Sequence, residues 1–322
     1  YHYDDGAVYG FPTKYENSRW ILINEDMFKE AGLDIPYDGW TYSEFLADAE
    51  KLTHGEGQDK VYGVCWARKQ SGKSILYALD GVLGANQIYK NEEGTEVNFD
   101  NDVYRAGLNL VKETLDKGYA IPIEDEFSED ISVANTFLQG KCAIMLGVAQ
   151  MRLCMDQENY PHDFMTALVP APVPDDEKYN TEFYRKQIGT TGAGDLLSIS
   201  ANTKYPEASF EFAMWYLKGG MSPLVQGGRI PLWNGVNKDE VLSVLKEKAQ
   251  GSIDMDSMET YLSLDTTGGV AAIKGNASSE ISSAWFEEFD AMCYGKQSVD
   301  QTVQNMEKRG NELIQTELSS QK

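Results

Sequence analysis

The stretch that decides the fold runs from Gly6 to Thr53 and reads GAVYGFPTKYENSRWILINEDMFKEAGLDIPYDGWTYSEFLADAEKLT. Four consecutive apolar residues, Trp20 to Ile23, predict a short strand buried on both faces, because a half-exposed strand alternates apolar and polar residues. Asn24 can cap the helix that follows, and Gly32 can end it in the left-handed conformation that glycine adopts without strain. The stretch therefore predicts a buried strand leading directly into a helix, as in α/β proteins.

Strand and helix patterns continue to alternate outward from this stretch. Thr41 and Glu44 form a capping box that opens a second helix. Further strands are predicted at 61–66, 142–146, 164–169 and 196–200, and helices at 74–83, 103–118, 206–217, 238–249, 278–292 and 299–313. Continuous apolar strands between helices imply a sheet covered on both faces, followed by a mostly helical C-terminal region.

Length and charge exclude several classes of function. The 322 residues are enough for about two domains, and 28 basic against 51 acidic residues give a net charge of −23. Such a chain is unsuited to nucleic acid or to anionic membrane surfaces. The longest apolar run, Cys142 to Ala149, is too short to span a bilayer. Position 1 is Tyr and no signal segment precedes it, so we expect the natural N-terminus to lie outside this sequence.

The residues that usually carry metal or nucleophilic chemistry are sparse. The four cysteines show no CxxC spacing, so we expect unpaired, partly buried thiols, with a Cys142–Cys154 bridge as the alternative. The three histidines form no helical pair, which disfavours a zinc hydrolase. No GxSxG nucleophile motif occurs. The sequence therefore predicts a protein that is not an enzyme and needs no cofactor or metal.

One motif points to a different class of function. Ala67 to Ser74, ARKQSGKS, fits a loosened phosphate loop in which Gly72, Lys73 and Ser74 would hold phosphates and magnesium. Such a site also needs a strand that ends in an aspartate, and neither 142–146 nor 164–169 does. A P-loop nucleotide-binding NTPase is therefore the alternative hypothesis. The glycines at 189, 192 and 194 precede a strand rather than follow one, which favours a flexible linker.

The six tryptophans fall into two groups. Trp20, Trp40 and Trp215 lie within apolar patterns and are predicted to belong to the core. The others, Trp66, Trp233 and Trp285, lie beside polar loops or on a helix face that fits core and site equally. Aromatic rings next to polar side chains suit a carbohydrate site, since a pyranose offers an apolar face for stacking and hydroxyls for hydrogen bonds.

The Gly6–Thr53 stretch resembles the segment of ABC-importer extracellular solute-binding proteins, the maltodextrin or sugar-binding type, that begins at their first interlobe crossover. The shared features are a YG-x-P turn, an aromatic strand, an Asn-led helix ending in AGL, and a Trp before a capped helix. Later pieces agree in the same order: FLQGKCAIMLG (137–147), LVPAPVP (168–174), LLSISANTKYPEASFEFAMWYL (196–217) and YGKQSVDQTV (294–303). The resemblance thus covers nearly the whole chain.

The resemblance implies an α/β, periplasmic-binding-protein-like fold of two lobes with ligand in the cleft between them. Relatives carry about a domain's worth of chain before the YG-x-P turn, so it implies that most of the N-terminal lobe is absent here. The implied domains are 1–14 (end of the N-terminal lobe), 15–194 (C-terminal lobe), 195–250 (returning segment of the N-terminal lobe) and 251–322 (C-terminal helices packed on the C-terminal lobe). The returning segment would expose apolar surface around Phe212 and Trp215 and be mobile, swapped or packed against another molecule.

The resemblance also implies where ligand would bind. Crossover residues reach the cleft in the family, and so do the loop after residue 65 and the GVAQ turn after Met145. Maltodextrin binders carry a stacking tryptophan at that turn where this chain has Val148 or Ala149, which argues against maltodextrin itself. The implied ligand-binding residues are Tyr15, Glu16, Asn17, Arg19, Trp66, Arg68, Asp195, Trp233 and Trp285.

The function implied by the resemblance is non-catalytic. The chain would be the substrate-binding component of an ABC importer, binding a mono- or oligosaccharide and delivering it to a membrane permease. It would act outside the cytoplasm, either periplasmic, secreted or held at the cell surface by a lipid anchor. A glycan-cleaving enzyme is a third hypothesis, which hydrolysis of a chromogenic glycoside would favour.

Overall fold

The structure, a computed structural model, describes residues 7–16, 19–66, 89–91, 93–128, 136–186, 192–220, 222–233, 235–264 and 277–320. Its larger sheet has the strand order β3 (Tyr62–Cys65), β4 (Cys142–Leu146), β2 (Trp20–Asn24), β5 (Thr166–Pro170). Strand β3 is parallel to β4, and β2 is antiparallel to both of its neighbours. A smaller sheet has the order β6 (Gly192–Leu197), β1 (Phe11–Glu16), β7 (Ile230–Pro231), all antiparallel.

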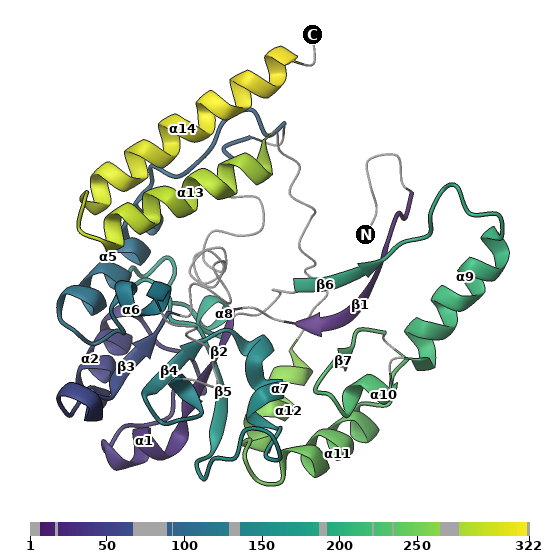
Figure 1. Cartoon of the computed structure of the whole chain (residues 1–322), viewed down its shortest axis with the longest axis horizontal. Helices are drawn as coiled ribbons and strands as arrows, with labels where there is room; N and C mark the ends of the chain where they lie inside the picture. Colours follow the sequence, from purple (N-terminus) through teal and green to yellow (C-terminus); the bar gives the residue numbers. More distant parts are fainter. Residues whose placement is uncertain are drawn as a thin grey trace.

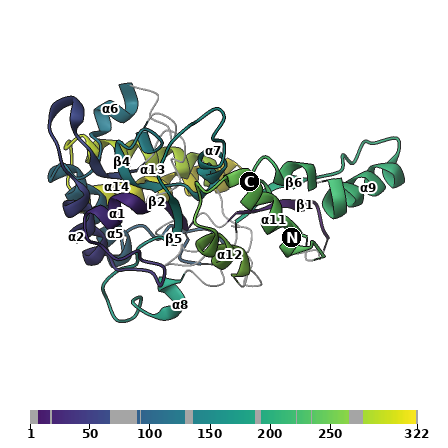
Figure 2. The same ribbon diagram turned by 90° about the horizontal axis from the view of Figure 1, so that it is seen from below.

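Figure 1 shows the two sheets side by side, with most helices around the larger one. The helices are α1 (Glu25–Glu30), α2 (Tyr42–Leu52), α5 (Asp102–Asp116), α6 (Ile123–Ser128), α7 (Met151–Cys154), α8 (Glu182–Arg185), α9 (Pro206–Trp215), α10 (Ser222–Val225), α11 (Lys238–Ala249), α12 (Met255–Ser263), α13 (Ser278–Cys293) and α14 (Val299–Ser320). We call the larger sheet with its helices the large lobe, and the sheet β6-β1-β7 the small sheet. In the turned view of Figure 2 the small sheet and α9 project from the large lobe.

Strand β2 sets the layers of the large lobe, because its side chains alternate between two separate cores. Ile21 and Ile23 pack with residues of α2, α5, α13 and α14. Trp20 and Leu22 point the other way and pack with residues of α7, α11 and α12. The sheet is therefore covered on both faces, as the unbroken apolar run predicts.

The local signals around β2 are confirmed by the hydrogen bonds. The Asn24 side chain accepts a bond from the Met27 N–H at 3.1 Å. Both bonds of the Thr41–Glu44 capping box are present. Gly32 adopts a φ of +67° beyond the end of α1, where a side chain would be strained.

Other predicted elements differ in their ends or were missed. Strand β6 begins at Gly192 rather than at 196, and Gly192 and Gly194 pair with Glu16 and Lys14 of β1, so the linker interpretation of these two glycines is wrong. Their backbone groups pair well without a side-chain pattern to reveal the strand. Helix α12 was missed, because serine occupies part of its buried face. The helix predicted at 74–83 and Gly189 lie outside the described residues.

The packing of α11 bears on the domain boundaries. Val241, Leu245 and Ala249 of this helix lie in the same core as Trp20 and Leu22 of β2. The described part of the 195–250 segment thus divides: β6 and β7 belong to the small sheet, while α11 covers the second face of the large lobe. Strand β1 keeps residues 15 and 16 in the small sheet as well.

Two of the three tryptophans predicted to lie in the core do so. Trp20 and Trp40 are fully buried, and the Trp40 indole N–H donates to the carbonyl of Pro170 at 2.9 Å. Trp215 is 60% exposed, so its core assignment is wrong for this chain. Its exposure, together with that of Phe212, agrees with the apolar surface that the resemblance implies for this segment.

Gly63 of β3 tests the closeness of helix and sheet. A Cβ at this position would lie 2.3 Å from the carbonyl oxygen of Ala49 in α2, so Gly63→Ala must push α2 away from the strand. We expect a loss of about 2–3 kcal/mol in the free energy of unfolding, measured by urea denaturation. The control is Gly219→Ala, where nothing lies within 4 Å of the added carbon. Equal stability of the two variants would contradict the packing of α2 on β3.

Candidate ligand-binding site at the crossover edge

The start of β2 and the ends of β3, β4 and β5 lie at one edge of the large sheet, and the predicted site residues lie near these strand ends. Because β2 runs antiparallel to β4 and β5, its start lies beside their ends, with Trp20 opposite Pro170 and Ile21 opposite Leu146. Strand β3, parallel to β4, ends at the same edge. We call this the crossover edge, since the chain passes between the small sheet and the large lobe here (Figure 1). Ligands of open α/β sheets bind beyond such strand ends.

Arg19 begins the large lobe at the crossover edge. Its backbone carbonyl accepts a hydrogen bond from the Ala171 N–H at 2.7 Å, which joins the start of β2 to the end of β5. The Arg19 side chain is buried and engaged by neighbouring groups. Arg19 is 7% exposed, so its part in ligand binding stays a prediction.

The turn after β4 is shaped by its glycine. Gly147 has a φ of +122°, which other residues rarely adopt, and a 3-10 turn at Val148–Gln150 leads directly into α7. The Val148 side chain is buried in the second core. The turn lies at the crossover edge, where Ile21 pairs with Leu146, and Val148, one of the two residues at the position where maltodextrin binders stack a ring, belongs to the core.

Trp66, the last described residue before 89, is a correction to the predicted site. Its side chain is only 5% exposed, it packs against Phe45 of α2, and its indole N–H donates to the Thr114 hydroxyl at 2.9 Å. Trp66 shares the core of Val64, two residues earlier. That period-two spacing, which places both on one face of the strand, was the signal for a core residue.

Trp285 is corrected for the same reason. It is 1% exposed in α13, and its ring stacks on Phe289 at 4.9 Å with 9° between the planes. Ile281 and Phe289, four residues to either side, lie in the same core. Both faces and edges of the indole are thus enclosed by protein, which leaves no ring face for a sugar.

Trp233 keeps the exposure that a stacking residue needs. It lies just after β7, whose residues Ile230 and Pro231 pair with Tyr15 and Lys14 of β1, and it is 40% exposed. Its six-membered ring covers Gly235, where a Cβ would come within 2.4 Å of the ring. Part of the six-membered ring is therefore held against Gly235 while part of the side chain faces solvent.

The loop that leads into β7, the strand before Trp233, packs on α7 beside the crossover edge. Gly228 has a φ of +76°, and a Cβ there would lie 2.7 Å from the methyl carbon of Met155 and 2.9 Å from Cβ of Arg152. The loop before β7 thus lies directly on α7, the helix that follows the Gly147 turn. Sequence patterns did not identify this contact, although a glycine-rich loop beside a strand was its one visible sign.

Of the remaining predicted site residues, three lie in strands of the small sheet and two lie outside the described residues. Tyr15 and Glu16 lie at the end of β1, and Asp195 lies in the adjacent strand β6. Asn17 and Arg68 lie outside the described residues, as do Gly72, Lys73 and Ser74 of the phosphate-loop alternative.

The described residues include no group of three His, Cys, Asp or Glu side chains that could hold a metal ion, and no helix among them has the length and apolar character to cross a bilayer. All four cysteines are free thiols, so the Cys142–Cys154 alternative is not realised. Burial raises the pKa of the Cys154 thiol to about 12, which keeps it protonated and unreactive.

Comparison with known families gives this architecture a context, since the family model for bacterial extracellular solute-binding proteins matches residues 2–218. The chain belongs to this family. The family expectation from the sequence is therefore confirmed. It is a family of binding proteins, and nothing in the match supports the P-loop NTPase alternative.

Solved structures agree on the fold. An ABC substrate-binding protein of Listeria monocytogenes in complex with cycloalternan matches with a TM-score of 0.70 at 17% identity, covering 98% of this chain and 74% of the other. The sugar-binding protein MalE of Xanthomonas citri matches with a TM-score of 0.68 at 17% identity, covering 99% of this chain and 74% of the other. A cyclic alpha-maltosyl-1,6-maltose binding protein of Arthrobacter globiformis matches with a TM-score of 0.65 at 16% identity, covering 97% of this chain and 73% of the other. These matches confirm the periplasmic-binding-protein-like α/β fold.

The core position of Trp66 can be tested through its hydrogen-bond partner. Thr114→Val keeps the side-chain shape but leaves the buried indole N–H without an acceptor, so we expect a loss of about 1–3 kcal/mol in the free energy of unfolding. Thr114→Ser retains the hydroxyl and should keep most of that stability. Identical denaturation curves for the wild type and Thr114→Val would contradict the assignment of Trp66 to the core.

Proposed function

We propose that this protein is the carbohydrate-binding component of an ABC importer. The observation that carries the proposal is the match of residues 2–218 to the solute-binding family. The carbohydrate is supported by the solved structures of similar fold, which include a cycloalternan complex, a sugar-binding protein and a receptor of Streptomyces glaucescens in complex with acarbose. Family membership further supports a site of action outside the cytoplasm and a membrane permease as the partner.

The crossover edge is the proposed binding site. Arg19, Tyr15, Glu16, Asn17, Arg68 and Asp195 would orient sugar hydroxyls, and Trp233 would stack on the apolar face of a pyranose ring. Trp66 and Trp285 are not part of this site, since both are enclosed in the core. The turn at Gly147 would contribute backbone groups.

The mechanism is a shift between conformations rather than a chemical step. A sugar that touches both the large lobe and the small sheet gains its full contacts only when the two approach each other, so binding stabilises that conformation. The permease would then distinguish liganded from unliganded protein by shape. No residue is required to make or break a covalent bond, and the proposal is that of a non-catalytic protein.

The proposal predicts stabilisation by carbohydrate. We expect at least one mono- or oligosaccharide to stabilise the protein by about 2.7 kcal/mol at a concentration one hundred times its dissociation constant, measured as a rise in Tm across a saccharide panel. Magnesium with ATP should leave Tm unchanged. Stabilisation by ATP without any by saccharides would overturn the proposal, while stabilisation by peptides or polyamines alone would remove the carbohydrate assignment.

A variant pair tests the site itself. Trp233→Ala should weaken binding of the identified sugar about fivefold, because stacking on an aromatic ring contributes on the order of 1 kcal/mol. Tyr294→Ala is the matched control, since this ring is 37% exposed at the end of α13 in the large lobe. Isothermal titration calorimetry gives both affinities, and equal losses in the two variants would contradict the placement of the site.

A further inference from the structure

Arg152 of α7 differs from other arginines of the large lobe. Arg105, Arg185 and Arg309 each lie within 3.1 Å of a carboxylate oxygen. Arg152 is exposed and forms no ion pair with any residue that the structure describes. The large lobe thus presents an uncompensated guanidinium although the chain has a net charge of −23.

Arg152 lies at the crossover edge, on the side of the large lobe that faces the small sheet. Helix α7 follows the Gly147 turn and lies between the two sheets in both views (Figures 1 and 2). A Cβ at Gly228 would lie 2.9 Å from Cβ of Arg152, so the loop before β7 touches this residue. The loop continues with Arg229, which is exposed and engaged by a neighbouring group. Two arginines from distant parts of the sequence therefore lie on adjoining backbones.

A third arginine belongs to the same region. Met151 and Ile230, the neighbours of Arg152 and Arg229 in the sequence, lie in one core with Trp20, which follows Arg19. Arg19 is largely buried, so it adds positive charge to this region rather than an exposed donor. The three arginines thus extend from a single core at one edge of the large sheet.

Acidic residues are absent from the sequence segments that form this side of the edge. Residues 131–155, which contain β4 and α7, include Lys141 and Arg152 and no Asp or Glu. Residues 212–238, which contain the loop before β7 and Trp233, include three basic residues and no Asp or Glu. With 51 acidic residues in 322, these 52 residues would carry about eight on average. The α7 side of the crossover edge is therefore positive in an otherwise acidic molecule.

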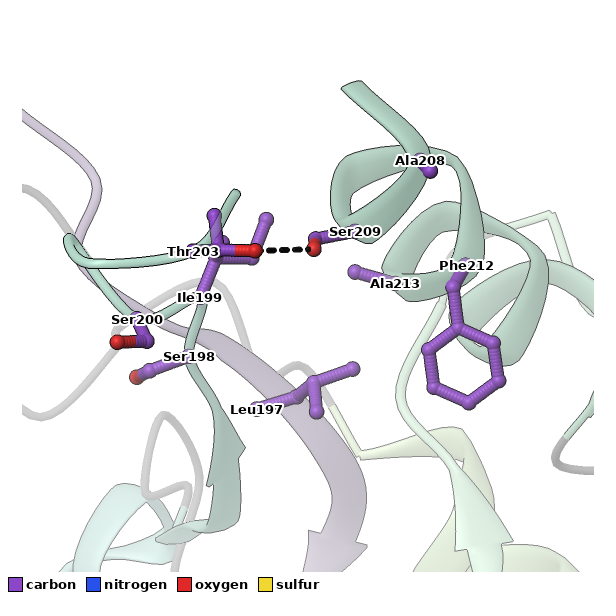
Figure 3. Close-up of a pocket in the computed structure, with 9 residues that line it drawn as sticks. All are labelled: Leu197, Ser198, Ile199, Ser200, Thr203, Ala208, Ser209, Phe212 and Ala213. Carbon is purple, nitrogen blue, oxygen red and sulfur yellow. Dashed lines mark hydrogen bonds between the residues drawn. The ribbon is translucent and has the colours of Figure 1, made fainter. Parts of the chain in front are cut away.

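Two hollows elsewhere on the described surface offer no comparable group of cations. The residues that line the hollow of about 460 Å³ between the end of β6 and α9 are all uncharged, and Figure 3 shows the Thr203 and Ser209 hydroxyls facing each other at 3.2 Å. A hollow of about 280 Å³ at the ends of α1 and α2 includes Lys51 and His54, but also the carboxyl group of Glu30. An anionic ligand is therefore better matched by the arginines at α7.

The chemistry of a guanidinium group favours an oxyanion as the ligand. Its parallel N–H donors match two oxygens of one carboxylate or sulfate, and hydrogen bonds between charged partners are about twice as strong as those between neutral groups. A neutral sugar would leave the charge of Arg152 uncompensated. Distant carboxylates of the chain repel an anion weakly, because salt screens exposed charges beyond about 8 Å at physiological ionic strength. The local excess of positive charge therefore decides what binds here.

We propose that the saccharide bound by this protein is acidic, and that its anionic group bonds to Arg152 with Arg229 alongside. The anionic group is the carboxylate of a uronic acid or an ester sulfate, which share the paired oxygens that a guanidinium binds. Trp233, four residues after Arg229, stacks on the pyranose ring. The inference rests on the proposed function, since it assigns a charge to the same sugar at the same site.

A panel of matched saccharides tests the charge of the ligand. The Tm of the 322-residue chain is measured with oligogalacturonates and their uncharged methyl esters, and with sulfated galactose oligosaccharides and their desulfated forms. We expect at least one acidic saccharide to raise Tm at about a tenth of the concentration that its neutral counterpart requires. The arm that responds identifies the anion. Stabilisation by neutral saccharides alone would overturn this inference and leave the sugar assignment standing, whereas no stabilisation by any saccharide would overturn both.

A variant pair tests the role of Arg152. Arg152→Gln keeps the Cβ that packs on Gly228 but removes the charge, so affinity for the acidic saccharide should fall about tenfold or more, because hydrogen bonds to charged groups contribute more than neutral ones. Affinity for the neutral counterpart should stay the same. Lys308→Gln removes one positive charge from a side chain that is 75% exposed on α14 and should change neither affinity. Isothermal titration calorimetry gives these values. Equal effects of the two substitutions, or equal losses for acidic and neutral saccharides, would contradict the assignment of Arg152.

Discussion

Burial of β2 on both faces is the constraint from which the rest of the structure follows. Four consecutive apolar side chains cannot be sheltered by one layer of helices, so each face of the sheet needs its own cover. The chain supplies the first from α2, α5, α13 and α14. The second cover includes α11 and α12, which follow β6, α9 and β7 in the sequence. The large lobe is therefore completed by chain that has passed through the small sheet and returned.

Because of this order, the second cover of the large lobe comes from chain that has crossed to the small sheet and back. The large lobe begins with Arg19 at the crossover edge, where the start of β2 lies beside the ends of β4 and β5. The loop before β7 lies on α7 through Gly228, and α7 follows the turn at Gly147. The loop before β7 and the turn after β4 are thus joined through their packing on α7.

Much of the fold followed from short-range signals in the sequence. The apolar run of β2, the Asn24 cap and the Thr41–Glu44 box each depend on neighbours within four residues, and each is present as predicted. Helix α12 was not predicted, because its buried face includes Ser257. The Ser257 hydroxyl accepts a hydrogen bond from the Leu168 N–H, 89 residues away in the sequence, and no local pattern reveals that contact. The glycine-rich start of β6 pairs through its backbone and carries no side-chain pattern. Contacts between distant segments decide such elements, and a local pattern cannot contain them.

The candidate site shows the same contrast between local sequence signals and contacts between distant segments. The strand boundaries place Arg19 and Trp233 beside the crossings, and their role in ligand binding stays a prediction. Trp66 was assigned to the site because polar residues follow it, and Trp285 because its helix face fitted core and site equally. Neither pattern shows what a ring touches in space. Trp66 precedes a polar loop, yet its indole reaches back to Thr114 in α5.

Trp215 presents the opposite case, since its apolar neighbours predict a core that the described chain does not supply. The two errors have one physical origin: an indole has both a large apolar surface and a polar N–H, so either environment can satisfy part of it. For Trp66 the sheet and α2 enclose the ring and Thr114 accepts its proton, which satisfies both parts. Among the described residues, Trp215 meets the ring of Phe212 in its own helix, and 60% of its surface stays exposed. The burial of a tryptophan is decided by whether a second layer of chain reaches it, and α9 lies where the small sheet offers just one.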